Sequence, residues 1–205
     1  MRPLARLFRI LLLTTLLSSF ASIAQAAIIF SDDFNRTNSN TVGNGWTELE
    51  DDANDVAIRN GRLRLRDTLP GNPDAASTNA ISTLGFTDIM LSFDWAASSN
   101  TESSDDFYVD WSTDNANFTN LFSTGLGGSG FESVSLGPLA GLGGNDPIYL
   151  RFWIDVSTST ETVRIDNVVL SGTRIGGPSR VSEPATLLLL GLGLLCLAGA
   201  RRGIH

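Results

Sequence analysis

A period-two alternation of apolar and polar residues recurs along the middle of this 205-residue chain. It is clearest in "IMLSFDW" (89–95), "FYVDW" (107–111) and "IYLRFWID" (148–155). This pattern is typical of β-strands that bury one face. Turn-rich segments such as "STDNAN" and "LAGLGGND" separate the runs, and no interval between them sustains the 3.6-residue period of a helix. We therefore expect an all-β fold in which two antiparallel sheets bury their apolar faces against each other.

One β-hairpin is predicted more sharply than the other elements. In "VAIRNGRLRLR" (56–66), Asn60-Gly61 separates two alternating segments. An Asn-Gly pair suits a two-residue type I′ turn, because both central residues of that turn need positive φ. The alternation predicts that Leu63 and Leu65 point into the core, and that the arginines between them point outward.

The N-terminus has the layout of a secretory signal peptide. Residues 1–9 carry three arginines and no acid, residues 10–23 are mainly apolar, and Ala24-Gln25-Ala26 supplies small residues for a signal peptidase. We expect export across the inner membrane with cleavage after Ala26. A retained N-terminal anchor is the alternative.

Composition excludes several function classes for the exported domain. The single cysteine, Cys196, lies in an apolar tail, and the single histidine, His205, is the last residue. This excludes a disulfide, a Ser-His-Asp triad, a Cys-His pair and an ordinary zinc site in the domain.

The chain contains no lysine and has a net charge of −8. That charge repels phosphate backbones, so we expect no nucleic-acid partner, while cations and neutral sugars remain possible ligands. The acidity also serves solubility.

Several segments resemble a known group of domains. "DDFYVDWSTDNANFTNL", "ESVSLGPL", "IYLRFWIDV" and "VRIDNVVLSG" resemble the MAM-like and laminin-G-like jelly-roll modules of secreted bacterial proteins. The resemblance implies an antiparallel jelly-roll β-sandwich over residues 27–173, followed by a linker at 174–180. Such modules act as adhesins, sugar binders or spacers. The Glu-x-Asp-x-x-Glu pattern of the laminarinase branch has no match in this chain, so we expect no enzyme.

Two groups of oxygen ligands suggest a structural calcium site. In jelly rolls the terminal strands usually lie side by side, which would bring together acids and amides from both ends of the domain. Crowded carboxylates repel each other unless a cation lies among them, and calcium takes six to eight oxygens. The predicted ligands are Asp32, Asp33, Asn35, Asp166 and Asn167. Alternatively, these acids cap turns or pair with Arg36 and Arg164.

A second constellation suggests a glycan-binding platform. Aromatic rings stack on sugar faces, and acids or arginine bind hydroxyl groups. On two strands, the residues that face away from the core include both kinds. They are Tyr108, Asp110, Tyr149, Arg151, Trp153 and Asp155. The alternative is that Arg151 only bridges Asp110 or Asp155 across strands while Trp153 lies under a glycine-rich loop.

The C-terminus has a three-part layout. "VSEP" at Val181, Ser182, Glu183 and Pro184 precedes an apolar helix at 185–200, and Arg201-Arg202 follows. The helix is about 24 Å long, against a hydrocarbon core of about 30 Å, so it is a marginal transmembrane anchor. The arginines hold its end on the cytoplasmic side. The layout resembles the PEP-CTERM sorting signal (181–205), although Ser182 replaces the usual first proline. This resemblance implies processing by the membrane protease exosortase.

These observations predict an exported, surface-sorted and non-enzymatic β-sandwich protein. It would be held in the membrane by its C-terminal helix, cut by exosortase, and delivered to the cell envelope, cell surface or exopolysaccharide matrix. A structural or glycan-binding role follows, with exopolysaccharide as the ligand of interest. Two alternatives remain: a glycan-cleaving enzyme, which needs two acids about 5 to 9.5 Å apart in a groove, and a passive spacer.

Overall fold

The computed structural model describes residues 26–50, 52–67, 75–78, 80–127 and 130–175. In these ranges every regular element is a β-strand, and every strand pairing is antiparallel. The predicted signal peptide (1–26), except for Ala26, lies outside them, and so do the rest of the predicted linker from residue 176 and the C-terminal helix. No helix that could cross a membrane occurs in the described part of the chain. The all-β prediction is therefore confirmed for the described residues.

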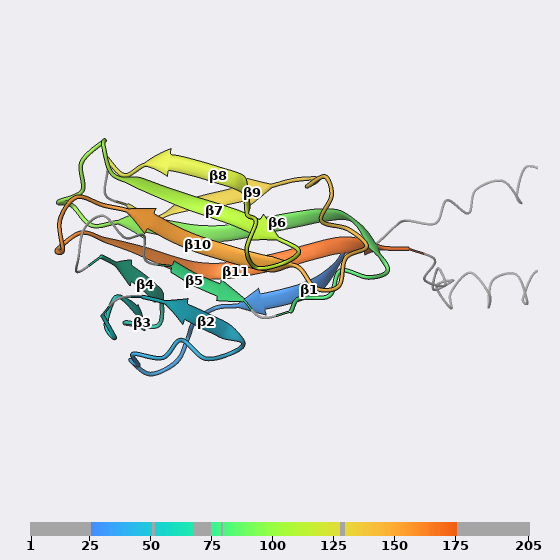
Figure 1. Cartoon of the computed structure of the whole chain (residues 1–205), viewed down its shortest axis with the longest axis horizontal. Helices are drawn as coiled ribbons and strands as arrows, with labels where there is room; N and C mark the ends of the chain where they lie inside the picture. Colours follow the sequence, from blue (N-terminus) through green and yellow to red (C-terminus); the bar gives the residue numbers. More distant parts are fainter. Residues whose placement is uncertain (1–25, 51, 68–74, 79, 128–129, 176–205) are drawn as a thin grey trace, which may run out of the picture. The chain divides into compact units, whose positions relative to one another are not determined.

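The strands form two sheets (Figure 1). The first, called here the β11 sheet, has the order β3-β4-β11-β6-β9, with β1 also paired to β11. Its strands are β1 (Ala26–Asp32), β3 (Val56–Ile58), β4 (Leu63–Arg66), β6 (Phe86–Ala97), β9 (Glu132–Leu136) and β11 (Thr162–Arg174). The second, the β10 sheet, has the order β2-β5-β10-β7-β8. Its strands are β2 (Trp46–Leu49), β5 (Ala75–Thr78), β7 (Asp106–Ser112), β8 (Thr119–Gly125) and β10 (Tyr149–Asp155).

The predicted alternation accounts for the core between the sheets. Along β6 the side chains at 89, 91, 93 and 95 are buried, and along β10 so are those at 150, 152 and 154. The two sheets meet through aromatic rings: Phe93 of β6 lies 5.4 Å from Phe152 of β10, edge to face. Within the β10 sheet, Phe107 of β7 stacks on Phe152 at 6.2 Å. Such pairs add to the free energy gained from burial alone.

The predicted hairpin forms as expected. β3 pairs with β4, with Ile58 opposite Leu63. Asn60 and Gly61 have φ of 54° and 67°, and Arg59 and Arg62 exchange both backbone hydrogen bonds around them. Leu63 and Leu65 are fully buried. The type I′ turn that joins the strands is thus confirmed.

The terminal strands lie side by side, as the jelly-roll resemblance implied. β1 pairs with β11 from Ala26 opposite Thr173 to Asp32 opposite Val168. β4 pairs with the first part of β11, and β1 pairs with the later part of the same edge. β6 pairs with the other edge of β11 along nearly its whole length. Strand β11 runs to Arg174, one residue into the predicted linker.

Gln25–Gly176 forms one compact unit. In the described residues, its buried hydrophobic side chains lie between Phe34 and Leu170, and Ile29 and Phe30 pack against them. Because the unit has its own hydrophobic core, we expect it to fold on its own.

Candidate functional site

Most of the predicted platform residues come together on the outer face of the β10 sheet. β10 and β7 are neighbours, with Trp153 opposite Tyr108 and Arg151 opposite Asp110. The rings of Tyr108 and Trp153 stack at 4.1 Å between centroids, with 12° between their planes. The prediction that these side chains share one face is therefore supported by the register and by direct contact.

Asp110 holds this face together. Its Oδ2 accepts hydrogen bonds from Arg151 Nη2 at 2.7 Å and Trp153 Nε1 at 2.6 Å. Its Oδ1 accepts one from Asn120 Nδ2 at 3.0 Å. Although its strand position faces outward, Asp110 is only 5% exposed, because these partners cover it. The arrangement fixes the Trp153 ring and the Arg151 guanidinium in place before any ligand binds.

The structure adds Phe118 to the platform. The Arg151 guanidinium lies 3.8 Å from the centre of the Phe118 ring and 5.5 Å from that of Trp153. Sequence reasoning missed Phe118 because it follows an irregular turn. Asp114 orders that turn by accepting hydrogen bonds from the backbone N–H of Asn117 and Ala116. Hydrogen bonds from Asn117, Ser112 and Ala116 hold the pKa of Asp114 far below its usual value. The "STDNANF" pattern, an Asx turn before an aromatic residue, was the available signal.

The other two predicted platform residues lie at its margins. Tyr149 is on the same face, opposite Ser112, and Asp155 is exposed, opposite Asp106. The hydroxyl of Tyr108 donates to Asp106 at 3.1 Å. Partial burial, then the contact with Asp106 and the charge of Asp155, raise the pKa of Tyr108. We use the name platform below for Tyr108, Asp110, Phe118, Arg151 and Trp153.

The five predicted calcium ligands separate into two groups. Asp32 is opposite the buried Val168 and faces the core, where it accepts hydrogen bonds from Arg36, Asn44 and Trp46. Asp33 accepts hydrogen bonds only from nearby Asn35 in the described contacts. The alternative pairing of Asp32 with Arg36 is therefore present.

Asp166 and Asn167 point elsewhere. They lie at a bulge in β11, where Asn167 has a φ of 50°. Asp166 pairs with Arg62 at 3.3 Å, and Asn167 Nδ2 donates to Asp94 at 2.8 Å. The adjacency of the terminal strands was right, but the bulge at Asp166–Asn167 reverses the alternation along β11, so Asp166 points to the face opposite Asp32. Calcium binding at these five residues stays a prediction.

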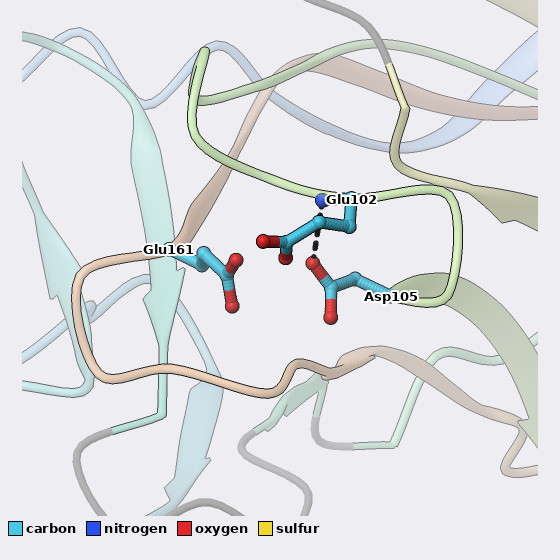
Figure 2. A group of neighbouring side chains, drawn as sticks. All are labelled: Glu102, Asp105 and Glu161. Carbon is cyan, nitrogen blue, oxygen red and sulfur yellow. Dashed lines mark hydrogen bonds between the residues drawn. The ribbon is translucent and has the colours of Figure 1, made fainter.

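A different group of acids does come together. The ligand atoms of Glu102, Asp105 and Glu161 all lie within 4.8 Å of one another. Figure 2 shows the three carboxylates turned toward each other, with Glu161 on one connection and the other two on a second. We call these residues the acidic cluster. It is the one group of this kind in the described ranges.

Burial and charge make the acidic cluster unusual. Asp105 is 1% exposed and Glu161 is 0% exposed, whereas Glu102 reaches solvent. The nearby Glu161 and Asp105 carboxylates raise the pKa of Glu102. Burial raises that of Asp105, but hydrogen bonds from the backbone N–H of Glu102 and Ser157 more than offset it, so its pKa is lowered. Sequence reasoning missed the cluster because 56 positions separate Asp105 from Glu161.

The C-terminal resemblance is confirmed by comparison with known families. Residues 180–202 match the model of the PEP-CTERM protein-sorting motif. The match includes all four residues of "VSEP" and both arginines, which lie outside the described residues. The motif implies export, processing by exosortase and transient anchoring in the membrane. No curated protein matches the chain.

Solved structures resemble the sandwich. One is the K3 cleaved adhesin domain of Lys-gingipain from Porphyromonas gingivalis, with 16% identity over 70% of this chain and 98% of that chain, and a TM-score of 0.52. Another is a family 29 carbohydrate-binding module from Piromyces equi, with 11% identity over 72% of this chain and 90% of that chain, and a TM-score of 0.47. The similarity to the adhesin domain is a similarity of fold. The chain thus joins an all-β sandwich to a C-terminal PEP-CTERM protein-sorting motif.

Proposed function

We propose that this protein is a non-enzymatic glycan-binding module that exosortase delivers to the cell surface or the exopolysaccharide matrix. The observation that carries the binding role is the platform, in which Asp110 holds Trp153 and Arg151 in a set geometry beside Tyr108. We also propose that the N-terminal segment is a signal peptide that directs export, and that the sandwich is a jelly roll. The pairing of β1 with β11 supports that type.

The chemistry of the platform favours neutral glycans. The charge of Arg151 is balanced by Asp110, and Asp106 and Asp155 flank the Tyr108–Trp153 pair. The surrounding carboxylates repel anionic polymers but accept hydrogen bonds from sugar hydroxyls. The outer faces and edges of the aromatic rings offer apolar contact to the C–H groups of a sugar ring.

The platform can be tested with glycans of known composition. Affinity electrophoresis of Gln25–Gly176 in gels that contain mixed-linkage β-glucan, xylan, galactomannan or the anionic alginate measures retardation directly. We expect binding to a neutral polymer, and a loss of at least about tenfold in affinity for Trp153→Ala, because it removes the stacked ring and frees Tyr108.

The matched control is Phe131→Ala. Phe131 is 47% exposed and contacts Arg62, which ends the turn between β3 and β4, away from the platform. Its loss should leave glycan binding unchanged. Binding by Trp153→Ala that equals the wild type, or no retardation by any polymer, would refute the glycan role and leave a spacer.

Processing at the C-terminus has its own test. We expect Glu183→Ala to block exosortase processing, because it removes the charged residue of the "VSEP" motif just before the apolar helix. Intact-mass analysis of protein recovered from the native host should show that the wild type has lost Cys196 and that the variant retains it. Ser182→Ala is the control, since that position already departs from the usual motif. Equal processing of Glu183→Ala contradicts the role given to this residue.

Neither the acidic cluster nor the surface hollow beside β6 offers a suitable pair of acids for the competing enzymatic function. In the acidic cluster, Asp105 and Glu161 are buried, so a sugar ring does not reach the space between them. A surface hollow beside β6, lined by Phe86, Pro138 and Ile175 among others, carries Asp88 as its one carboxylate. Glycoside hydrolysis by the usual mechanism needs two. These observations support the non-enzymatic proposal.

A further inference from the structure

The acidic cluster joins two connections at one end of the sandwich. Residues 98–105 lead from β6 of the β11 sheet to β7 of the β10 sheet, and residues 156–161 lead back from β10 to β11. The backbone N–H of Ser98 donates to Thr162 O at 2.8 Å, and that of Ser157 donates to Asp105 Oδ1 at 3.0 Å. The cluster therefore lies where two sheet-to-sheet crossings already contact each other.

No cation of the described residues balances the charges of the cluster. In the described ranges, no arginine forms an ion pair with Glu102, Asp105 or Glu161, and the chain has no lysine. Three carboxylates at this separation repel one another, and burial of two of them strengthens the repulsion. Without a cation, the cluster reduces this repulsion only by taking up a proton.

One buried oxygen is left without a partner. Glu161 Oε2 accepts a hydrogen bond from the backbone N–H of Thr158 at 2.8 Å. Glu161 Oε1 is equally buried, and no donor from the described part of the chain reaches it. A buried carboxylate oxygen without a donor costs free energy, and such atoms are rare in folded proteins. Figure 2 shows the Glu161 carboxylate, which carries this oxygen, directed toward Glu102 and Asp105.

We propose that Glu102, Asp105 and Glu161 bind a calcium ion that fastens the β6–β7 connection to the β10–β11 connection. Oxygens that share one Ca²⁺ at about 2.4 Å lie at most about 4.8 Å apart, a limit that the three ligand atoms meet. The ligands are all hard oxygens, which suit calcium rather than zinc or copper. The exposed side of Glu102 leaves room for the water molecules that complete six to eight ligands. This inference does not depend on glycan binding.

The test is the thermal unfolding of Gln25–Gly176 in EDTA and in rising CaCl₂. With the site saturated about 100-fold above its Kd, we expect the wild-type Tm to rise by about 5–10 °C. Glu161→Gln should abolish the rise. In EDTA this variant should be at least as stable as the wild type, because the carbonyl oxygen of the new amide still accepts the Thr158 N–H and one of the repelling charges is gone. Isothermal titration with CaCl₂ should show one site in the wild type and none in Glu161→Gln.

Three further variants make the result specific. Glu102→Gln changes an exposed side chain, so it should fold normally and weaken calcium binding at least about tenfold. Glu132→Gln, an exposed acid at the start of β9, should respond like the wild type. Asp33→Asn changes a ligand of the site predicted at the terminal strands, and it should also keep the full response.

The proposal is overturned if CaCl₂ at about 10 mM, above the millimolar Kd of extracellular modules, leaves the wild-type Tm and titration unchanged. It is equally overturned if Glu161→Gln or Glu102→Gln keeps the full response. Loss of binding in Asp33→Asn alone would place the ion at the terminal strands instead. A larger response to MgCl₂ than to CaCl₂ would refute the choice of calcium.

Discussion

Asp32→Asn should lower the free energy of unfolding of Gln25–Gly176 by about 3–5 kcal/mol. Asp32 is 4% exposed, and its two oxygens accept hydrogen bonds from the Arg36 guanidinium, Asn44 and the Trp46 indole. Asparagine has the same shape but presents an N–H₂ group to these donors. Arg36 would then be left with an uncompensated charge, and Trp46, which packs on Phe152, would lose its anchor. Urea unfolding at neutral pH measures the effect.

Asp33→Asn is the matched control for this substitution. Asp33 is the next residue but is exposed, so its loss should change stability by less than about 0.5 kcal/mol. If Asp32→Asn proves no more harmful than Asp33→Asn, Asp32 does not hold this end of the sandwich as described.

The effect of Asp32 should depend on pH. Burial alone would raise the pKa of Asp32, but hydrogen bonds from Arg36, Asn44, Phe34 and Trp46 outweigh burial, and the pKa is lowered. A group with a lowered folded-state pKa stabilises the fold above its unfolded-state pKa, and this contribution is lost as pH falls toward the folded value. The difference between wild type and Asp32→Asn should therefore shrink as the pH falls from about 7 to about 3. A constant difference would contradict the shift.

Asp110→Asn should destabilise the unit by about 2–4 kcal/mol and also disorder the platform. Asp110 is the shared acceptor for Arg151, Trp153 and Asn120. Arg151 Nε is already buried without a partner, so loss of the Nη2 bond leaves a largely unsatisfied guanidinium. Near-ultraviolet circular dichroism should report loss of the fixed Tyr108–Trp153 stack, together with the lower urea midpoint.

The control for Asp110 lies on the same face. Asp155→Asn removes an exposed carboxylate from β10 and should leave both stability and the aromatic signal unchanged. An unchanged aromatic signal in Asp110→Asn would show that the rings hold each other without the carboxylate. Glycan binding would then not depend on Asp110.

Asp32 and Asp110 have the same kinds of hydrogen-bond partner. Each bonds one arginine and one tryptophan indole: Asp32 bonds Arg36 and Trp46, and Asp110 bonds Arg151 and Trp153. At Asp32 the indole is buried and supports the core. At Asp110 the indole lies on the outer face, where the same bonding orients a ring toward solvent. The first pair therefore serves stability, and the second can serve ligand binding.

Local patterns in the sequence were enough for the strands and for the hairpin. Alternation along β6 and β10 predicted which side chains are buried, because successive residues of a strand point to opposite faces. Asn60-Gly61 predicted its turn, since few other pairs accept positive φ twice. The same alternation predicted that Tyr108 and Trp153 face away from the core. Their stacking depended on β7 and β10 being neighbours, and the order of strands in a sheet is not written in local patterns.

The sequence by itself determined the strand faces, the one tight hairpin and the C-terminal sorting motif, because each is written in adjacent or regularly spaced residues. Only the tertiary structure decided which acids meet. It separated Asp32 from Asp166, because a bulge at Asp166–Asn167 reverses which residues of β11 face the core. It brought Glu161 to Asp105, because two crossings between the sheets share one end of the sandwich. Contacts of that kind follow from the packing of distant segments, and no local pattern encodes them.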